Sequence, residues 1–329
     1  MTPRARPPLF RRPGAVVLLD DDADYLEMLA MVLPRHWPLR LFTRPTLCVH
    51  AFHRELTLWE ADRWQVQYLV DLWRQGKPLL PQILGYWARA TERYGLTQVC
   101  VVDFSMPAMD GLQVLSELVD WPGARVLLTG QADERVAVHA FNRRLIDHYI
   151  PKQAPNIALH LIETLDMLAQ RACERFESII AATLSPAQHA LLRAPGVPQA
   201  LEDFIRRRWI EHMVIGDPFG VLGMDAAGRI GWLQFETREG LAAQAELAEL
   251  EGLPPPVVAE IRCGHRLANL ELRQGLDRRC GVEHGPAFAL GDEASLLAAL
   301  FDVQGQVLAP APASYESWLA QQPPRAVPR

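Results

Sequence analysis

The chain has 329 residues, which is enough for about two domains at a usual size of ~150 residues each. Nearly half of the residues are apolar (49%) and 22% are charged, so the composition excludes a largely disordered protein. The net charge of −6 argues against a protein whose whole surface binds nucleic acid, although it leaves room for one basic module.

The cysteines and the short apolar runs predict a cytoplasmic protein with no membrane partner. The five cysteines are odd in number and widely scattered, which is typical of reduced thiols and not of a disulfide framework. Unbroken apolar runs such as Ala15–Leu19 are far shorter than the ~18 residues of a membrane span. Residues 1–13 are basic and Pro-rich, without the apolar core of a signal peptide, and are expected to form a disordered tail.

Alternating strand and helix signals predict a doubly wound α/β domain over residues 14–155. Ala15–Leu19 is a continuous, β-branched apolar run, which is typical of a strand buried on both faces of a parallel sheet. A helical period follows over residues 25–32, Leu39–Thr43 is a second strand, and residues 45–94 are mostly helical. The alternating signals beyond them are Val99–Val102, Leu112–Leu118, Arg125–Thr129, Glu134–Phe141 and His148–Ile150.

A long amphipathic helix is predicted to link this domain to the rest of the chain, over residues 156–184. Its apolar residues recur at spacings of three and four, close to a heptad seam. A free seam of that length in water would pair, so we expect a homodimer unless the stripe packs within one chain. The stripe consists of Leu161, Leu165, Leu168, Ala172, Phe176 and Ile179.

Residues 185–312 are predicted to form a second, α+β domain, and residues 313–329 a Pro-rich tail. Two apolar runs flank a turn sequence at residues 225–228, which predicts a β-hairpin over Val221–Phe235. The other expected elements are helices at Leu201–Val214 and Thr237–Leu250, and strands at Arg266–Leu272, Ala287–Leu290 and Leu296–Phe301.

Acidic residues stand at the ends of two of the predicted parallel strands. Asp20 and Asp21 follow the first strand, and Asp103 follows Val99–Val102. Because the carboxyl ends of parallel strands meet at one edge of a sheet, we expect these carboxylates to converge there. Three converging carboxylates repel one another unless a cation neutralises them, and oxygen ligands suit Mg²⁺.

A hydroxyl and an ammonium group are expected at the same edge. Thr129 ends the next strand, and Lys152 lies just beyond the last one. Lysine is rare in this chain, since only Lys77 and Lys152 of the 33 basic residues are lysines. A compact ammonium, a hydroxyl, a metal and a carboxylate nucleophile are the groups needed to place a phosphoryl group on Asp103 and to stabilise its oxygens.

The four motifs that carry these residues resemble the receiver domain of two-component response regulators. In chain order they are Ala15–Asp22 (AVVLLDDD), Asp103–Gly111 (DFSMPAMDG), Leu128–Gly130 (LTG) and Tyr149–Lys152 (YIPK). The resemblance covers residues 15–155 and implies a CheY-like, five-stranded parallel sheet. It implies nothing about residues 185–329.

The resemblance implies a role for each acidic residue. Asp103 accepts a phosphoryl group from a partner histidine kinase. Asp21 and Asp103 bind Mg²⁺ directly, and Asp20 binds it through water. The backbone carbonyl of Ser105 supplies a further metal ligand.

The phosphate-binding and switch residues are implied in the same way. Thr129 donates to a phosphoryl oxygen, and Lys152 pairs with another. Tyr149 stands where the family has its switch aromatic, which turns inward when Thr129 moves toward phosphate, although it could instead be an ordinary core residue. Gln153 replaces the family's usual proline after the lysine, which puts the cis peptide often found there in doubt.

A helical insertion at about residues 45–98 is predicted by the spacing of the motifs. Asp21 and Asp103 lie 82 positions apart, which is much more than in typical receivers. Aromatic-rich helices beyond a complete core need something to cover them, so they either pack back on the chain or form a dimer or partner surface. Four of the nine tryptophans lie here: Trp59, Trp64, Trp73 and Trp87.

Three functions stay open for the C-terminal half. The hairpin, followed by a helix, resembles the opening of a PAS domain and favours signalling through contacts with a downstream protein. The alternatives are an unfamiliar DNA-binding module that uses Arg206–Arg208, which is not favoured, and an enzyme controlled by the receiver. Because no independent catalytic motif is recognised, the only chemistry expected is self-phosphorylation and dephosphorylation.

A C-x-H…C-x₃-H set in this half has the ligand types of a zinc site. It consists of Cys263, His265, Cys280 and His284. Its spacing matches no familiar zinc motif, so we expect these to be unrelated core residues.

Overall fold

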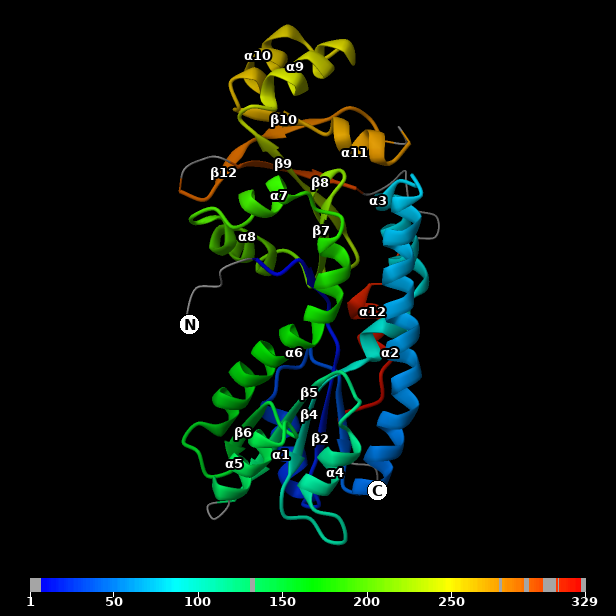
Figure 1. Cartoon of the computed structure of the whole chain (residues 1–329), viewed down its shortest axis with the longest axis vertical. Helices are drawn as coiled ribbons and strands as arrows, with labels where there is room; N and C mark the ends of the chain where they lie inside the picture. Colours follow the sequence, from blue (N-terminus) through cyan, green and yellow to red (C-terminus); the bar gives the residue numbers. More distant parts are fainter. Residues whose placement is uncertain are drawn as a thin grey trace. The chain divides into compact units, whose positions relative to one another are not determined.

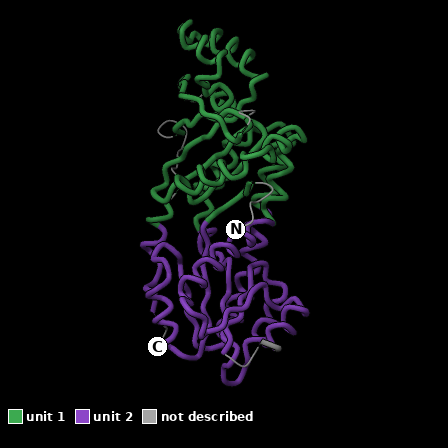
Figure 2. The backbone as a smooth tube through the Cα atoms, turned by 90° about the vertical axis from the view of Figure 1, so that its left-hand side faces the viewer, with its two compact units in different colours: residues 1–12, 65–91, 175–317 green, residues 13–64, 92–174, 318–329 purple. Residues whose placement is uncertain are grey.

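The chain forms two compact units in a computed structural model, drawn in different colours in Figure 2. The structure describes residues 7–130, 134–277, 280–292, 296–303, 312 and 314–326. The parallel-sheet unit comprises residues 13–64, 92–174 and 318–329, and the antiparallel-sheet unit comprises residues 1–12, 65–91 and 175–317. The division falls inside two long helices, α2 (Pro45–Arg74) and α6 (Ile157–Ala181), so each of them contributes to both units.

Five parallel strands form the centre of the parallel-sheet unit, in the order β3-β2-β4-β5-β6 (Figure 1). Every residue of β2 and β4 is buried, as expected for strands covered on both faces. The predicted doubly wound fold is therefore confirmed. The strands are β2 (Ala15–Leu19), β3 (Leu39–Phe42), β4 (Thr97–Asp103), β5 (Ala124–Thr129) and β6 (His148–Pro151), and the shorter helices are α1 (Ala23–Val32), η1 (Thr91–Gly95), α4 (Gly111–Glu117) and α5 (Glu134–Asn142).

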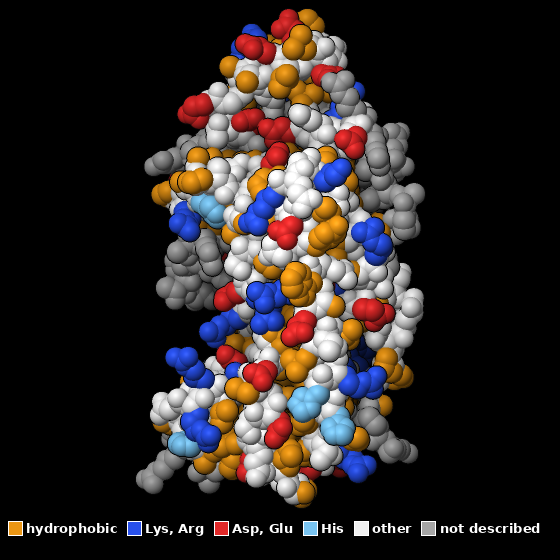
Figure 3. Space-filling model, turned by 45° about the vertical axis from the view of Figure 1, so that its right-hand side comes forward, with side chains coloured by type: hydrophobic (Ala, Val, Ile, Leu, Met, Phe, Trp, Pro, Cys, Tyr) orange, Lys and Arg blue, Asp and Glu red, His pale blue; other side chains and the backbone are white. Residues whose placement is uncertain are grey.

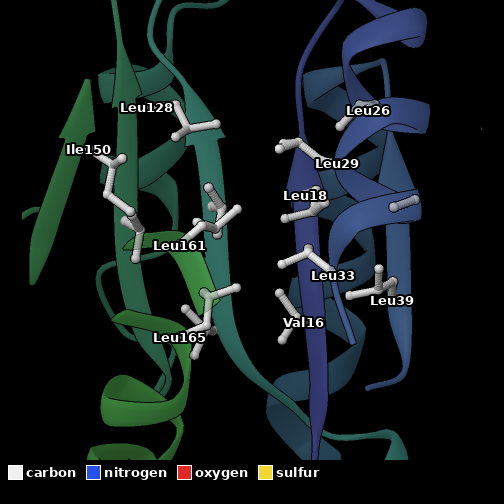
Figure 4. Close-up of a cluster of buried hydrophobic side chains, with 14 of the residues drawn as sticks. Val16, Leu18, Leu26, Leu29, Leu33, Leu39, Leu128, Ile150, Leu161 and Leu165 are labelled. Carbon is white, nitrogen blue, oxygen red and sulfur yellow. The ribbon is translucent and has the colours of Figure 1, made fainter. Parts of the chain in front are cut away.

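Helices α1 and α6 cover one face of this sheet. Leu18 of β2, Leu29 of α1 and Leu165 of α6 belong to one cluster of buried apolar side chains (Figure 4). Leu161 and Leu168 of α6 lie in the same cluster, and both are fully buried. The remaining stripe residues of α6, Ala172, Phe176 and Ile179, are buried as well.

The prediction that this stripe forms a free dimer seam is wrong. Its first half is part of the parallel-sheet core, and Phe176 stacks on Phe10 with ring centroids 4.9 Å apart. A heptad-like period records that one face of a helix is apolar, but not which partner covers it. In this structure, other parts of the same chain cover the apolar face of α6.

Leu165→Glu is therefore expected to lower the free energy of unfolding by about 3–5 kcal/mol, because a buried leucine is lost and a charge is left unpaired in an apolar core. Met167→Glu is the matched control on the same helix, since Met167 is 46% exposed, and it should change stability by no more than ~0.5 kcal/mol. Urea unfolding followed by circular dichroism measures both. A Leu165→Glu protein as stable as wild type, but dissociated, would restore the seam model.

The predicted helical insertion is present as most of α2, α3 (Leu79–Arg89) and η1. Trp59 and Trp87 are fully buried, and the Trp59 indole N–H donates to Glu55 Oε1 at 3.3 Å. Trp64 is instead 72% exposed. Apolar side chains lie scattered among charged ones on the side of the molecule where α2 runs (Figure 3). Two of the four tryptophans thus pack back on the chain, and a partner surface on α2 stays a prediction.

A six-stranded antiparallel sheet forms the centre of the other unit, in the order β1-β7-β8-β9-β13-β12. This confirms the α+β class, and the PAS-like resemblance stays a prediction. The strands are β1 (Phe10–Arg11), β7 (Glu211–Gly216), β8 (Phe219–Met224), β9 (Ile230–Thr237), β12 (Phe288–Leu290) and β13 (Leu296–Asp302). A further pair is β10 (Arg266–Ala268) and β11 (His284–Pro286), and the helices are α7 (Pro186–Leu191), α8 (Val197–Arg206), α9 (Leu241–Leu250), α10 (Pro255–Arg262) and α11 (Leu270–Gly275).

Two elements of this unit differ from the predictions. The helix predicted over Leu201–Val214 ends at Arg206, and the chain then enters strand β7. The helical spacing of Leu201, Ile205 and Trp209 runs past the true end of the helix, because Trp209 also packs into the same core. The strand predicted over Arg266–Leu272 is only three residues long and leads directly into α11.

The ends of the chain are not tails where the structure describes them. Phe10 pairs with Met213 across β1 and β7 and is fully buried, so the expected disordered tail is wrong for this stretch. The strand is only Phe10 and Arg11, in a stretch of prolines and arginines, which is too short a signal to predict it. Tyr315–Ala320 form helix α12 within the predicted C-terminal tail. No helix in the described part of the chain is long and apolar enough to cross a membrane.

Candidate functional site

Three carboxylates meet at the carboxyl edge of the parallel sheet. Asp20 and Asp21 follow β2, Asp103 ends β4, and these two strands are neighbours with Leu19 opposite Val102. One carboxylate oxygen from each aspartate lies within 4.8 Å of the others. Asp20 and Asp103 are buried, at 1% and 3% exposure, whereas Asp21 is exposed. The convergence predicted from the strand ends is therefore present.

Backbone N–H groups hold the two buried carboxylates in place. Asp22 N–H donates to Asp20 Oδ1 at 3.0 Å, and Ser105 N–H donates to Asp103 Oδ2 at 3.1 Å. The side chain of Asp22 instead accepts from Asp24 and Tyr25 N–H as the N-cap of α1. The third aspartate of the DDD run thus starts a helix, while the first two face the site.

Lys152 bridges the two buried carboxylates. Its Nζ lies 2.7 Å from Asp20 Oδ2 and 2.8 Å from Asp103 Oδ1. Its backbone N–H donates to the Thr129 carbonyl at 2.8 Å, which fixes the chain where β6 ends. Asp217–Pro218 is the only cis peptide bond among the described residues, so the bond between Lys152 and Gln153 is trans.

The charges of this cluster perturb one another. Burial raises the pKa of Asp20, and the contact with Lys152 only partly opposes it. For Lys152, burial lowers the pKa, but the hydrogen bonds to Asp103 and Asp20 outweigh it and raise the pKa above its ordinary value. The ammonium is therefore held in its charged form beside the carboxylates.

Thr129 and Tyr149 lie on the strands next to Asp103. Thr129 ends β5 and is buried at 2% exposure, and β5 pairs directly with β4. Tyr149 lies on β6 opposite Leu127 and is half-buried, so it is not an ordinary core residue.

Tyr25 is a site neighbour that the sequence reasoning missed. The Lys152 Nζ lies 4.7 Å from the centroid of the Tyr25 ring, which is within the range of a cation–π contact. Burial is the largest cause of a raised pKa at Tyr25. Its place four residues after Asp21, in the first turn of α1, was the available signal.

The loop after Asp103 explains the DFSMPAMDG motif. A Cβ at Gly111 would lie 2.3 Å from the Asp103 carbonyl oxygen, so only glycine permits this close return of the chain. Asp110 caps α4 by accepting from Gln113 N–H at 2.8 Å in a capping box. Asp110 therefore shapes the loop, and Asp103 is the acidic residue of this motif that faces the cluster.

The residues present fit a divalent cation. Three carboxylates and one ammonium leave an excess of negative charge, and hard oxygen donors of this kind suit Mg²⁺. In the described part of the chain this is the only group of three or more acidic, His or Cys side chains close enough to share an ion. The structure does not bring Cys263, His265, Cys280 and His284 into such a group.

Comparison with solved structures places this geometry on a known fold. The response regulator LqsR of Legionella pneumophila matches 95% of this chain and 95% of its own, with a TM-score of 0.69 and 21% sequence identity. This chain therefore shares the fold of LqsR. The match spans both units, so the antiparallel-sheet unit also belongs to the shared fold.

Two smaller solved structures each match about half of the chain. A CheY-like receiver from Methanospirillum hungatei JF-1 covers 50% of it, with 98% of its own length, 14% identity and a TM-score of 0.31. TrrA of Thermotoga maritima, in complex with Mg²⁺ and BeF, covers 47% of it, with 98% of its own length, 16% identity and a TM-score of 0.31. No protein-family model and no curated protein matches the sequence.

Proposed function

We propose that this protein is a two-component response regulator whose Asp103 accepts a phosphoryl group from a histidine kinase. The observation that carries the proposal is the Asp103 carboxylate itself, which is buried, contacts the Lys152 ammonium and lies beside two further carboxylates. Labelling with a small phosphodonor, described in the Discussion, tests it.

The proposed transfer is a substitution at phosphorus. A carboxylate oxygen of Asp103 attacks the phosphorus of the phosphohistidine, the O–P bond forms, and the N–P bond breaks. The released imidazole nitrogen takes a proton from solvent. In the second half of the cycle, a water oxygen attacks the phosphorus and forms a new O–P bond, while the O–P bond to Asp103 breaks. The water gives up a proton to solvent, and inorganic phosphate leaves with the Asp103 carboxylate restored.

Lys152 and Thr129 stabilise the phosphoryl oxygens in this proposal. Lys152 already lies 2.8 Å from Asp103 Oδ1, so it can pair with a phosphoryl oxygen on that atom without leaving the site. Thr129, at the end of the neighbouring strand, donates its hydroxyl to another oxygen. Tyr149 then turns inward as Thr129 moves, which carries the signal to the surface of the unit.

Asp20, Asp21 and Asp103 would hold Mg²⁺, together with the backbone carbonyl of Ser105. When bound, the ion supplies charge neutralisation and Lewis-acid polarisation of the phosphoryl oxygens. Exposed Asp21 is the carboxylate with the freest access to solvent, which suits an ion that keeps part of its water shell.

Magnesium binding is expected to depend on Asp21. Asp21→Ala should abolish the Mg²⁺-dependent changes in NMR chemical shifts around Asp103, because a direct carboxylate ligand is lost. Asp24→Ala is the matched control, since Asp24 is exposed in the first turn of α1 and should leave the Mg²⁺ response intact. An equal response in wild type and Asp21→Ala would contradict the acidic metal site.

We propose that the antiparallel-sheet unit signals in the cytoplasm through contacts with a downstream protein. The alternative, nucleic-acid binding by Arg206–Arg208, is less favoured because two of these three side chains are engaged locally. Arg206 Nε lies 3.0 Å from Glu202 Oε1, and the Arg208 guanidinium lies 4.0 Å from the centroid of the Phe204 ring. A homodimer stays part of the proposal, without α6 as its seam.

A further inference from the structure

The antiparallel-sheet unit contains a cavity that the proposed phosphoryl chemistry does not use. Its volume is about 430 Å³, within the range of small-molecule sites. The end of α2, the start of α3, the β7–β8 turn and α11 contribute its walls. Its lining combines the aromatic side chains of Trp73 and Phe219 with the carboxylates of Asp217 and Glu271.

Glu271 is the least satisfied polar group of this lining. Its Oε2 is buried and has no hydrogen-bond partner. Burial raises the pKa of its carboxyl group to about 7, the charges of Glu236 and Asp217 add to this, and a backbone hydrogen bond from Phe219 opposes it. A buried carboxylate oxygen without a partner costs free energy that a bound donor would recover.

The carboxylate of Asp217 contacts an aromatic side chain of the same lining. The Trp73 indole N–H donates to Asp217 Oδ2 at 3.2 Å, which joins the end of α2 to the β7–β8 turn. Among the described residues, no cation forms an ion pair with Asp217 or Glu271. Lys77 is the one basic residue of the lining, and its side chain is exposed.

We propose that this cavity binds a small organic amine, with its ammonium group held by Glu271 and Asp217 and its apolar part against Trp73 and Phe219. An ammonium donates up to three hydrogen bonds, so it can satisfy both carboxylates at once. The Trp73 indole adds the aromatic face that favours a cation over a neutral ligand. The proposal is independent of phosphorylation at Asp103.

An amine fits this lining better than a metal ion or an anion. In the described part of the chain, the acidic side chains of this lining belong to no group of three or more metal-ligating side chains, unlike those at Asp103. An anion would have only Lys77 as a partner and would face the carboxylates of Asp217 and Glu271.

Isothermal titration calorimetry on the full-length protein tests the proposal with three probes of one shape. These are 2-phenylethylamine, 2-phenylethanol and phenylacetate, with butylamine as a smaller amine and Mg²⁺ alone as a metal probe. At pH 8 we expect the amines to bind, the alcohol to bind at least about tenfold more weakly, and phenylacetate not to bind. Tighter binding of the alcohol, phenylacetate or Mg²⁺ than of both amines, or no binding of either amine, overturns the proposal.

Variants locate the site. Glu271→Gln should weaken binding of 2-phenylethylamine at least about tenfold, because a charge-assisted hydrogen bond is lost. Glu246→Gln, on the exposed face of α9, is the matched control and should bind as wild type does. Lys77→Gln should bind the amine equally well or more tightly. Equal affinity of Glu271→Gln and wild type, or weaker binding by Lys77→Gln, overturns the assignment.

The affinity should also rise with pH. The carboxyl group of Glu271 loses its proton around its pKa of about 7, while the ammonium of the probe keeps its charge, so affinity should increase about tenfold from pH 6 to pH 8. The titratable groups around Glu271 are Glu236 of β9, Asp217 and Lys77. Glu271→Gln should remove most of this dependence, and an unchanged dependence in that variant contradicts the role of Glu271.

Discussion

Asp103→Asn is expected to remove all phosphoryl transfer to this protein. An amide oxygen is a poor nucleophile and forms no acyl phosphate, whereas the side chain keeps its shape and can still accept the Ser105 N–H hydrogen bond seen in the wild type. With Mg²⁺ and a small phosphodonor, the wild type should gain one acid-stable, base-labile phosphate per chain. A time course of incorporation measures both proteins.

Asp110→Asn is the control for this experiment, because Asp110 lies in the same motif but caps α4. Asparagine is as good an N-cap as aspartate, so this variant should fold and be labelled as the wild type is. Undiminished labelling of Asp103→Asn would show that another residue accepts the phosphate. Loss of labelling in both variants would mean that the substitutions disturb the loop between Asp103 and Asp110, and it would not identify the nucleophile.

Lys152→Gln is expected to slow phosphorylation by about 10²-fold, the usual effect of removing one charged donor from a developing anion. The wild-type ammonium lies within 2.8 Å of the accepting carboxylate, and glutamine cannot replace its charge. The rate of incorporation at saturating phosphodonor is the measurement. Arg63→Gln, an exposed change of the same charge on α2, should leave the rate unchanged.

The same variant separates an electrostatic role of Lys152 from a merely structural one. Without the ammonium, the carboxylates of Asp20, Asp21 and Asp103 repel one another with no cation between them. Added Mg²⁺ should therefore raise the melting temperature of Lys152→Gln more than that of the wild type. A Lys152→Gln protein that is phosphorylated at the wild-type rate, with the same Mg²⁺ stabilisation, would contradict this account of the site.

The carboxylate cluster could be predicted from sequence because each part of it follows a local signal. A buried parallel strand has a readable apolar run, and the residue after it must lie at the carboxyl edge of the sheet. Asp20 and Asp103 follow such runs, and Lys152 stands out in a chain that otherwise uses arginine. The side-chain partnership of Tyr25 with Lys152 was missed because aromatic residues in a first helical turn have many other uses.

The predictions failed where the partner of an apolar segment could not be read from the sequence. The α6 stripe has the period of a dimer seam, yet Leu161 and Leu165 complete the core of the sheet. Strand β1 was missed because its two residues gain their stability from pairing with β7, about two hundred positions away in the sequence. Long-range pairing of this kind leaves no periodic signal.

The cavity of the antiparallel-sheet unit could not be predicted for the same reason. Trp73 and Asp217, which hydrogen-bond across it, are 144 positions apart, and Glu271 comes from a third segment. No one of these segments has a motif, because the site exists only after the chain has folded. Lys77 was notable in the sequence only because lysine is rare in this chain, and nothing in the sequence linked it to a cavity.

Mass-spectrometric localisation of the phosphate shows which aspartate accepts the phosphoryl group. Wild-type protein is treated with Mg²⁺ and a small phosphodonor, reduced with borohydride, which converts an aspartyl phosphate to homoserine, and digested. We expect homoserine at position 103 and at no other aspartate, with none in protein that received no phosphodonor. Homoserine at Asp21 or Asp110, or a phosphorylated protein with no reducible acyl phosphate, would contradict this expectation.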